Sequence, residues 1–368
     1  MLIGSLLQWY AGMAGAQRRA PNAERRRRTP KRRAPKRRAP NAERRATMLL
    51  HVLNGDATRI PLEQSGVPGR FLVYVDVLHE GPAPGGLEPE EWRRVRAHHL
   101  AGGQDAPAAI VQSWRDADQT LDRYAEYEEI VFWFEHDLFD QLLLIRHLDW
   151  MSRLPDVSPF RLICIGEFLG HPRFAGLGEL NPRELASLFP LRRAMASDQV
   201  ALGSRLWKAF GAPDPRPFAA MVLDGDTAAL PFAAGALRRH LEDFPSTADG
   251  LSRTERQILT AAQPGDRSAR DLFLACGEME ERRYMGDSTF WTILRRLAHG
   301  RVPVLSTNGA FDTGKAPSGI FALTDAGREV LEGGADYVAL NGIDRWMGGV
   351  HLTDGRYRWD GTTVIRTS

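Results

Sequence analysis

Ile130-Val-Phe-Trp-Phe-Glu-His-Asp-Leu-Phe-Asp-Gln141 is the stretch of sequence that decides the fold. Its first five residues are all apolar and are β-branched or aromatic, which is typical of a strand covered on both faces of a parallel sheet. Polar residues follow at once. Residues 138–154 then carry an apolar stripe at helical spacing, formed by Leu138, Leu142, Ile145 and Leu148. The stretch therefore predicts a strand, an acidic turn and a helix.

Similar apolar runs lie on both sides of this unit. They cover residues 49–53, 71–77 and 162–165, and helical patterns separate them at 57–64, 89–100 and 107–127. Alternating strands and helices predict an α/β fold with a doubly wound, mainly parallel sheet. We therefore expect a Rossmann-like domain over residues 48–180.

Three further segments follow this domain. Residues 181–250 predict a helical connector, which begins at the cap Asn181 and is divided by prolines. The capping box Ser252-Arg-Thr-Glu255 opens a winged-helix-like α+β module over 251–335, in the order of three helices, two strands and a closing helix. Residues 336–368 form a tail, and one interpretation folds its segment 340–352 back onto the first domain, bringing His351 near the site.

Residues 1–47 form a basic arm. Fourteen Lys or Arg against two Glu give residues 1–45 a net charge of +12, which leaves −10 for the rest of a chain whose total is +2. The segment 18–26 is repeated at 37–45, so we expect disorder. One hypothesis is non-specific binding to nucleic acid or an anionic surface. The other is a misassigned start, which the abrupt change to strand-like sequence after Met48 favours.

Composition bounds the class of protein. A chain of 368 residues with 43% hydrophobic content is long enough for more than one domain. Cys164 and Cys276 are its only cysteines, and Cys164 lies in an apolar run, so we expect reduced thiols and a cytoplasmic protein. After the first 16 residues, which lack the charged start of a signal peptide, no stretch predicts a membrane span.

Polar residues follow all four predicted strands. The exits read Asn54-Gly-Asp56, then Asp76 with His79-Glu-Gly-Pro82, then Glu135-His-Asp137 with Asp140 and Gln141, and finally Gly166-Glu167. Ligands of parallel sheets bind beyond the carboxyl ends of the strands. Each exit alone has a structural explanation, with Asp56 or Asp137 as a helix cap and His136 as an interior residue. Their coincidence instead indicates a site.

Carboxylates that crowd at one edge of a sheet repel one another unless something compensates their negative charge, and three kinds of compensation fit these residues. A Mg²⁺ or Mn²⁺ ion would take oxygen ligands from Asp56, Glu135 and Asp137. A carboxyl group held protonated could instead work with a histidine as acid and base, and a basic ligand is the third alternative. For catalysis we single out His79, Glu80 and His136; the substrate-binding candidates at these exits are Asn54, Gly55, Asp76 and Gln141.

The loop 166–178 adds a phosphate hypothesis. It contains four glycines and Arg173, whose guanidinium is suited to gripping an oxyanion. A plain connecting loop explains the glycines as well. Because the chain has no Walker loop, Gly-x-Gly-x-x-Gly or Gly-x-Ser-x-Gly motif, it does not resemble dinucleotide-binding enzymes or serine hydrolases.

The winged-helix-like module suggests a second function. Arg295 and Arg296 lie on its predicted third helix, 288–299, where a recognition helix would contact DNA. Residues 250–335 nevertheless carry 11 basic and 11 acidic side chains, whereas DNA-binding domains are usually basic. A protein-docking or structural role of this module is therefore favoured over DNA contact.

Four motifs in order resemble the bacterial family called domain of unknown function 1835. They are residues 51–56, 76–82, 132–141 and 165–168, namely His-Val-Leu-Asn-Gly-Asp, Asp-Val-Leu-His-Glu-Gly-Pro, Phe-Trp-Phe-Glu-His-Asp-Leu-Phe-Asp-Gln and Ile-Gly-Glu-Phe. The resemblance implies an intracellular bacterial protein and no particular activity. Our leading hypothesis is a metal-assisted hydrolase or transferase acting on a phosphate-containing, nucleotide-like small molecule; the alternatives are a ligand-responsive DNA-binding regulator and a protein-docking module.

Overall fold

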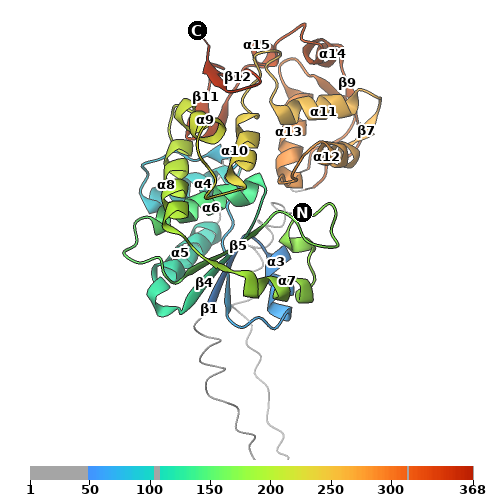
Figure 1. Ribbon diagram of the computed structural model, residues 1–368. Helices are drawn as coiled ribbons and strands as arrows, with labels where there is room; N and C mark the ends of the chain where they lie inside the picture. The colour runs from blue at the N-terminus through green and yellow to red at the C-terminus, as the bar shows by residue number, and fades with distance from the viewer. Residues whose placement is uncertain (1–48, 103–107, 313–314, 368) are drawn as a thin grey trace, which may run out of the picture.

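A five-stranded sheet forms the centre of the first domain in the computed structural model, which describes residues 49–102, 108–312 and 315–367 (Figure 1). The strand order is β2-β1-β4-β5-β6. Four strands are parallel: β1 (Leu49–Leu53), β2 (Arg70–Val73), β4 (Glu129–Glu135) and β5 (Phe160–Ile165). The predicted Rossmann-like α/β domain is thus confirmed, with β6 (Arg193–Ala194) as an additional antiparallel edge strand.

Helices cover both faces of the sheet. On one face lie α3 (Asp56–Gln64) and α7 (Pro182–Leu188); on the other lie α4 (Pro89–Leu100), α5 (Ala108–Asp122), α6 (Leu138–Met151) and α8 (Ser197–Phe210). Side chains alternate along β4, so that Val131 and Trp133 join the core on the α3 side while Phe132 and Phe134 join the larger core. This double covering explains the uninterrupted apolar run that the sequence shows.

The helical connector packs directly on the first domain. Its helices α8, α9 (Arg216–Leu223) and α10 (Ala233–Leu241) follow one another, and α8 and α10 both contact α6. Buried residues such as Leu206 and Leu237 belong to the same core as Phe132 of the sheet. The connector is therefore part of the body that holds the sheet.

Residues 253–331 form a separately cored unit, which we call the C-terminal module. It contains α11 (Arg253–Ala262), β7 (Arg267–Ser268), α12 (Ala269–Glu278), α13 (Asp287–His299), β8 (Leu305–Thr307), β9 (Ile320–Leu323) and α14 (Asp325–Leu331). Its own core includes Leu259, Leu294 and Phe321. The capping box at Ser252 is present and starts α11. The predicted helices and strands occur in the predicted order, but the sequence missed β7, which lies between α11 and α12 and pairs with β9. The winged-helix assignment itself stays a prediction.

The tail folds back onto the first domain. It consists of α15 (Tyr337–Asn341), β10 (Arg345–Gly348), β11 (Val350–Leu352), β12 (Tyr357–Trp359) and β13 (Val364–Arg366). Strand β10 pairs with the two-residue β3 (Gly81–Pro82), with Met347 opposite Gly81. His351 does not approach the acidic strand exits as one interpretation of the sequence suggested. It hydrogen-bonds Asp344 at the surface, at 2.7 Å. The tail thus connects the C-terminal module to the second strand exit.

Three short 3₁₀ helices complete the described chain, at Tyr124–Glu126, Leu177–Glu179 and Phe189–Leu191. Within the described ranges, no helix has the length and apolar character that crossing a membrane requires. Cys164 and Cys276 are both free thiols. The predicted basic arm and the start at Met48 lie outside the described residues.

Candidate functional site

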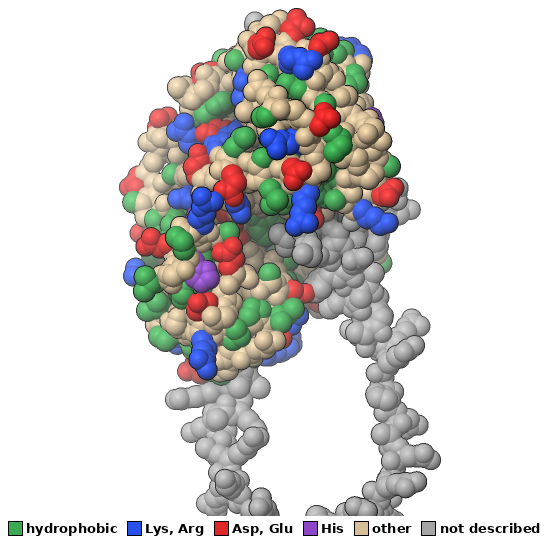
Figure 2. Space-filling view, turned by 90° about the vertical axis from the view of Figure 1, so that its right-hand side faces the viewer, with side chains coloured by type: hydrophobic (Ala, Val, Ile, Leu, Met, Phe, Trp, Pro, Cys, Tyr) green, Lys and Arg blue, Asp and Glu red, His purple; other side chains and the backbone are tan. Residues whose placement is uncertain are grey.

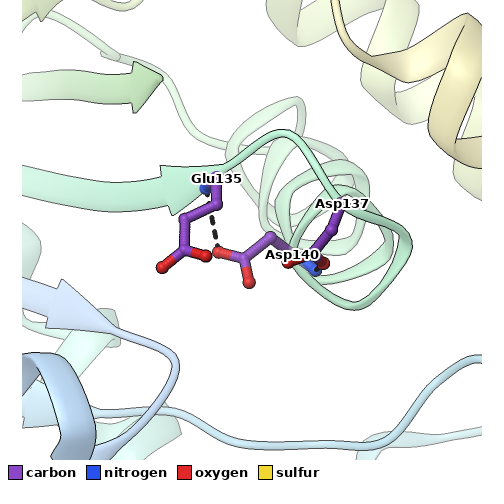
Figure 3. A group of neighbouring side chains, drawn as sticks. All are labelled: Glu135, Asp137 and Asp140. Atoms are coloured by element: carbon purple, nitrogen blue, oxygen red, sulfur yellow. Dashed lines mark hydrogen bonds between the residues drawn. The ribbon is translucent and has the colours of Figure 1, made fainter. Parts of the chain in front are cut away.

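Three carboxyl groups gather where β4 passes into α6, and we call them the carboxylate cluster (Figure 3). Glu135 is the last residue of β4, Asp137 is the N-cap of α6, and Asp140 lies in its first turn. Each offers an oxygen within 4.8 Å of an oxygen of the other two. Their exposed fractions are only 6%, 5% and 1%. The turn between strand and helix therefore places three acids in one buried spot.

Hydrogen bonds fix the positions of these acids. The Asp140 carboxylate accepts from the Glu135 backbone N–H at 3.0 Å and from the Asn54 amide at 2.5 Å, while Asp137 caps the helix by accepting from the Asp140 N–H at 3.0 Å. The Glu135 Oε1 accepts from the Leu177 N–H at 2.6 Å. The first strand exit, the third strand exit and the loop 166–178 thus meet at the cluster.

The electrostatics of the cluster are unfavourable to three negative charges. Burial raises the pKa of Asp137 to about 6. Burial, and then the neighbouring carboxylates, hold the pKa values of Glu135 and Asp140 well above their usual range. No Lys or Arg in the described residues forms an ion pair with any of the three. Without a bound cation, the raised pKa values therefore favour the protonated forms of the Glu135 and Asp140 carboxyl groups.

The loop 166–178 closes over the cluster. Gly176 has φ of +152°, and a Cβ at this position would overlap the Glu135 carboxylate. Phe174 and Ala175 of the same loop line a cavity. The sequence suggested that the glycines of this loop approach a phosphate. In the structure, Gly176 instead allows the loop to pack closely against Glu135.

A cavity of about 780 Å³ lies beside the cluster, between the first domain and the C-terminal module. Figure 2 shows the hollow between these two parts, with side chains of both charge signs at its rim. Its lining residues come from the third and fourth strand exits, the loop 166–178, α10 and the chain around α12: His136, Gly166, Glu167, His171, Pro172, Arg173, Phe174, Ala175, Phe232, Gly277, Glu278, Glu280, Glu281, Arg282 and Arg283. This volume lies within the about 300–1,000 Å³ of small-molecule pockets.

Arg282 is the cation of this cavity that faces the cluster. Its Nη1 lies 3.5 Å from the His136 carbonyl oxygen, and its guanidinium lies 5.7 Å from the centre of the Phe232 ring. Its charge counts among the influences that lower the pKa of Asp137. No ion pair to a carboxylate holds Arg282 within the described ranges. By contrast, Arg173, which was predicted to bind phosphate, forms an ion pair with Glu278 at 2.7 Å.

His136 lies between Glu135 and Asp137 in the sequence and lines the cavity. Its ring stacks on that of Phe174, and it donates a hydrogen bond to the Ile165 backbone carbonyl oxygen. Its Nδ1 is buried and has no hydrogen-bond partner among the described side chains and backbone groups. Burial, and then the charge of Arg282, lower the pKa of His136. The imidazole is therefore neutral at pH 7 and can accept a proton.

Other predicted residues have different surroundings. Asp56 does not join the carboxylate cluster; it pairs with Arg59 one turn along α3, and Asp140 takes the place expected for it. The buried Asp76 binds Arg96 of α4 through both oxygens, with a shortest distance of 2.7 Å. This pair neutralises Asp76 inside the domain. Gly55 precedes α3, and the structure shows no side chain within 4 Å of where its Cβ would stand.

His79 and Glu80 also lie away from the cavity lining. The His79 ring packs edge-on against Tyr284, and burial lowers the pKa of this histidine to about 3. The Glu80 carboxyl group lies by Thr289 of α13, and burial raises its pKa to about 7. Both side chains thus face the junction with the C-terminal module rather than the carboxylate cluster. Gln141 does reach the cluster, because its amide donates to the Glu135 carbonyl oxygen at 2.5 Å.

The two arginines proposed for DNA contact are held by the module itself. Arg296 pairs with Glu255 of α11 at 2.7 Å. Arg295 donates to the Phe311 carbonyl oxygen at 2.8 Å and lies over the Phe311 ring. The surface of α13 therefore offers less free positive charge than the sequence suggested.

Two residues of the candidate site, Asp140 and Arg282, were missed by the sequence-based prediction. Asp140 follows Asp137 by three residues in a predicted helix, so the spacing i, i+3 could have placed the two together. Arg282 lies 146 residues from His136 in sequence, and no local pattern connects them.

Comparison with known proteins adds no family: no family model matches the chain, and no curated protein matches its sequence. The resemblance to domain of unknown function 1835 stays a prediction.

Proposed function

We propose that this chain is a metal-assisted hydrolase or transferase, and that its substrate is a phosphate-containing, nucleotide-like small molecule bound in the cavity beside the carboxylate cluster. The observation that carries the proposal is the gathering of Glu135, Asp137 and Asp140 within 4.8 Å, buried and without a basic partner among the described residues. Three oxygen ligands of this kind suit Mg²⁺ or Mn²⁺ better than a structural zinc. When bound, such an ion polarises a phosphate oxygen or lowers the pKa of a water molecule.

The chain's own residues supply the remaining parts of the chemistry. Arg282 can bind a phosphate through its guanidinium, since no carboxylate in the described chain competes for it. His136 is held neutral and can take a proton through Nδ1. Phe174 and Phe232 present rings at the cavity wall. Flat aromatic surfaces of this kind favour a ligand with a base.

The experiment is a release assay for inorganic phosphate with the full chain, using ATP and p-nitrophenyl phosphate as substrates and Mn²⁺ as the ion. Asp137→Asn keeps the helix cap and removes the charge, so we expect activity to fall at least about a hundredfold. Arg282→Gln should raise KM more than it lowers kcat. The matched control is Asp56→Asn, which alters a carboxylate of the same sheet edge outside the cluster. Equal activity in Asp137→Asn and the wild type would contradict the proposal.

A further inference from the structure

A second cavity, of about 500 Å³, lies among the helices that cover the α6 side of the sheet. The start of α4, the ends of α5, α6 and α8, and the loop 83–88 line it. We call it the tryptophan cavity, because Trp92, Trp150 and Trp207 are in its lining. Nine tryptophans among 368 residues would put fewer than one into a lining of twenty residues. The cavity thus combines the volume of a small-molecule site with an unusual share of large aromatic rings.

The three indoles of this cavity carry unused hydrogen-bond donors that a ligand can reach. Each indole is half-buried, and none of the three N–H groups donates to an acceptor in the described chain. None of them is enclosed in the interior either. By contrast, the buried Trp114 and Trp133 both donate to protein acceptors, at 2.7 Å and 3.0 Å. The cavity therefore offers accessible ring surface together with accessible N–H groups.

Arg146 of α6 supplies a further set of donors at the wall. Its guanidinium carbon lies 4.7 Å from the centre of the Tyr74 ring and 5.8 Å from that of Trp92. It hydrogen-bonds the Tyr74 hydroxyl, and no carboxylate in the described ranges forms an ion pair with it. The nearby Asp118 is paired with Arg93 instead, at 2.6 Å. Arg146 is half-buried, so its remaining N–H groups are open to a ligand.

The lining as a whole carries no net charge, since four basic and four acidic side chains contribute to it. Asp149 is engaged with Arg153, at 3.4 Å. The carboxylates of Glu88 and Asp122 are exposed and form no ion pair with any described residue. Free donors and free acceptors are therefore both present, and neither sign of charge prevails. Such a lining favours an uncharged ligand that has donors and acceptors at its edge over an ion.

Helix α6 separates the tryptophan cavity from the carboxylate cluster. Asp137 is the N-cap of this helix, and Trp150 lies in its last turn. At 1.5 Å per residue, the two positions are about 20 Å apart along the helix axis. One mononucleotide cannot reach both places. The tryptophan cavity is thus a second site and not an extension of the cavity beside the carboxylate cluster.

We propose that the tryptophan cavity binds an uncharged, flat heteroaromatic ring of the nucleobase class. The ring stacks on the tryptophan side chains, as bases do on aromatic residues in nucleic-acid-binding proteins. Its acceptor atoms bond Arg146 and the indole N–H groups, and its donor atoms bond the carboxylates of Glu88 and Asp122. A purely apolar ligand would leave these polar groups unused, and an anion would gain nothing from a neutral lining.

Isothermal titration of the full chain with adenosine tests the proposal, with ribose as the second arm. We expect saturable binding of adenosine and none of ribose, because the base is the part that is recognised. Arg146→Gln should weaken adenosine binding about tenfold or more, and Trp92→Leu about fivefold or more. The matched controls are Arg295→Gln, which also removes a guanidinium from an aromatic ring, and Trp346→Leu, which removes a half-buried indole elsewhere. Both controls should leave the binding unchanged.

A measurement on the wild type locates the ligand without any variant. Hydrogen exchange followed by mass spectrometry should show that adenosine protects residues 83–93 and 204–211. Protection confined to residues 166–178 would place adenosine in the cavity beside the carboxylate cluster. That result would overturn this inference and leave the proposed function intact.

Phe232→Leu separates the two cavities in the titration. Phe232 is half-buried and lines the cavity beside the carboxylate cluster, so its replacement should leave adenosine binding in the tryptophan cavity unchanged. Absence of saturable adenosine binding overturns the proposal. So does adenosine binding that survives in both Arg146→Gln and Trp92→Leu, and so does saturable binding of ribose alone.

Discussion

The carboxylate cluster and the junction between α10 and the C-terminal module both bury acidic side chains, yet their electrostatics are opposite. At the junction, Arg239 pairs with Asp243 at 3.1 Å and with Glu280 at 2.8 Å, and Arg239 is only 6% exposed. Arg239, and then Arg345, hold the pKa of Asp243 well below its usual range despite burial. In the cluster, burial raises the pKa of Asp137 instead.

The comparison shows that the carboxylate cluster lacks a basic partner. The junction is complete because a guanidinium and the Thr254 hydroxyl satisfy its carboxylates. The cluster has hydrogen-bond donors from the backbone and Asn54, but its nearest basic group, Arg282, stands in the cavity. The presence or absence of a basic partner for these carboxylates therefore distinguishes a structural ion network from a site that can receive a cation.

The largest expected effect on stability comes from removing Arg239 from the ion pairs at the junction. Arg239→Ala leaves Asp243 and Glu280 buried without their cation, so we expect a loss of about 3–5 kcal/mol in the free energy of unfolding. Urea denaturation of the full chain measures it. The control is Arg238→Ala, which removes the exposed pair with Glu242 and should cost less than about 1 kcal/mol. Equal effects of the two substitutions would remove the distinction between the regions.

Asp137→Asn, by contrast, should raise the free energy of unfolding at neutral pH. The pKa of Asp137 is about 6 in the folded chain against an ordinary 3.8, so the folded state holds this proton more tightly than the unfolded state. The resulting stabilisation is fully present below pH 3.8 and is lost as the pH rises through 6. Asparagine keeps the helix cap and does not titrate.

The measurement is the difference in unfolding free energy between Asp137→Asn and the wild type at several pH values. We expect the free energy of unfolding of the variant, relative to that of the wild type, to rise by about 2 kcal/mol between pH 4 and pH 7, in the absence of divalent cations. A difference that does not change with pH would show that Asp137 is compensated as Asp243 is.

Gly176→Ala tests the packing of the loop 166–178 on the cluster. The added Cβ would overlap the Glu135 carboxylate and would adopt an unfavourable φ, so we expect a loss of about 1–3 kcal/mol and a displaced Glu135. Thermal unfolding measures the first effect, and weaker Mn²⁺ binding measures the second. Gly170→Ala, also at positive φ but with open space around it, is the control for strain alone.

The smallest effect should come from Arg173→Gln. Arg173 is 82% exposed and its partner Glu278 is 53% exposed, so the ion pair is screened by solvent and should contribute less than about 1 kcal/mol. Urea denaturation should show a change within this limit. A larger loss would mean that the loop and the C-terminal module depend on this contact.

Much of the fold was predictable because the local patterns are strong. The predicted first strand, 49–53, has the observed bounds of β1, and the run beginning at Ile130 lies within β4. The second strand ends at Val73 rather than residue 77, since Tyr74 to Val77 leave the ladder while staying buried. The strands β3, β6 and β10 were missed because two to four residues carry no period and gain their partners only from distant segments.

Among the predicted carboxylates, only those that share one turn came together in the structure, whereas Asn54 of the first strand exit was also predicted and does bond Asp140. Glu135 ends β4 and Asp137 follows two residues later, and the structure brings their carboxyl groups together as the sequence predicted. Asp56 and Asp76 follow other strands and are neutralised by Arg59 and Arg96. The Arg59 pair, three residues away, was visible in the sequence. The Arg96 pair was not, because it depends on how α4 packs.

Titration of the full chain with Mn²⁺ at pH 7.5, followed by electron paramagnetic resonance of the free ion, tests the central claim most directly. We expect one bound equivalent, at least about tenfold weaker binding in Asp137→Asn, and unchanged binding in Asp56→Asn. Binding should also weaken at pH 5.5, because protons then occupy Asp137. No saturable binding at pH 7.5, or binding that is equal in Asp137→Asn and the wild type, would contradict the assignment of the carboxylate cluster as a cation site.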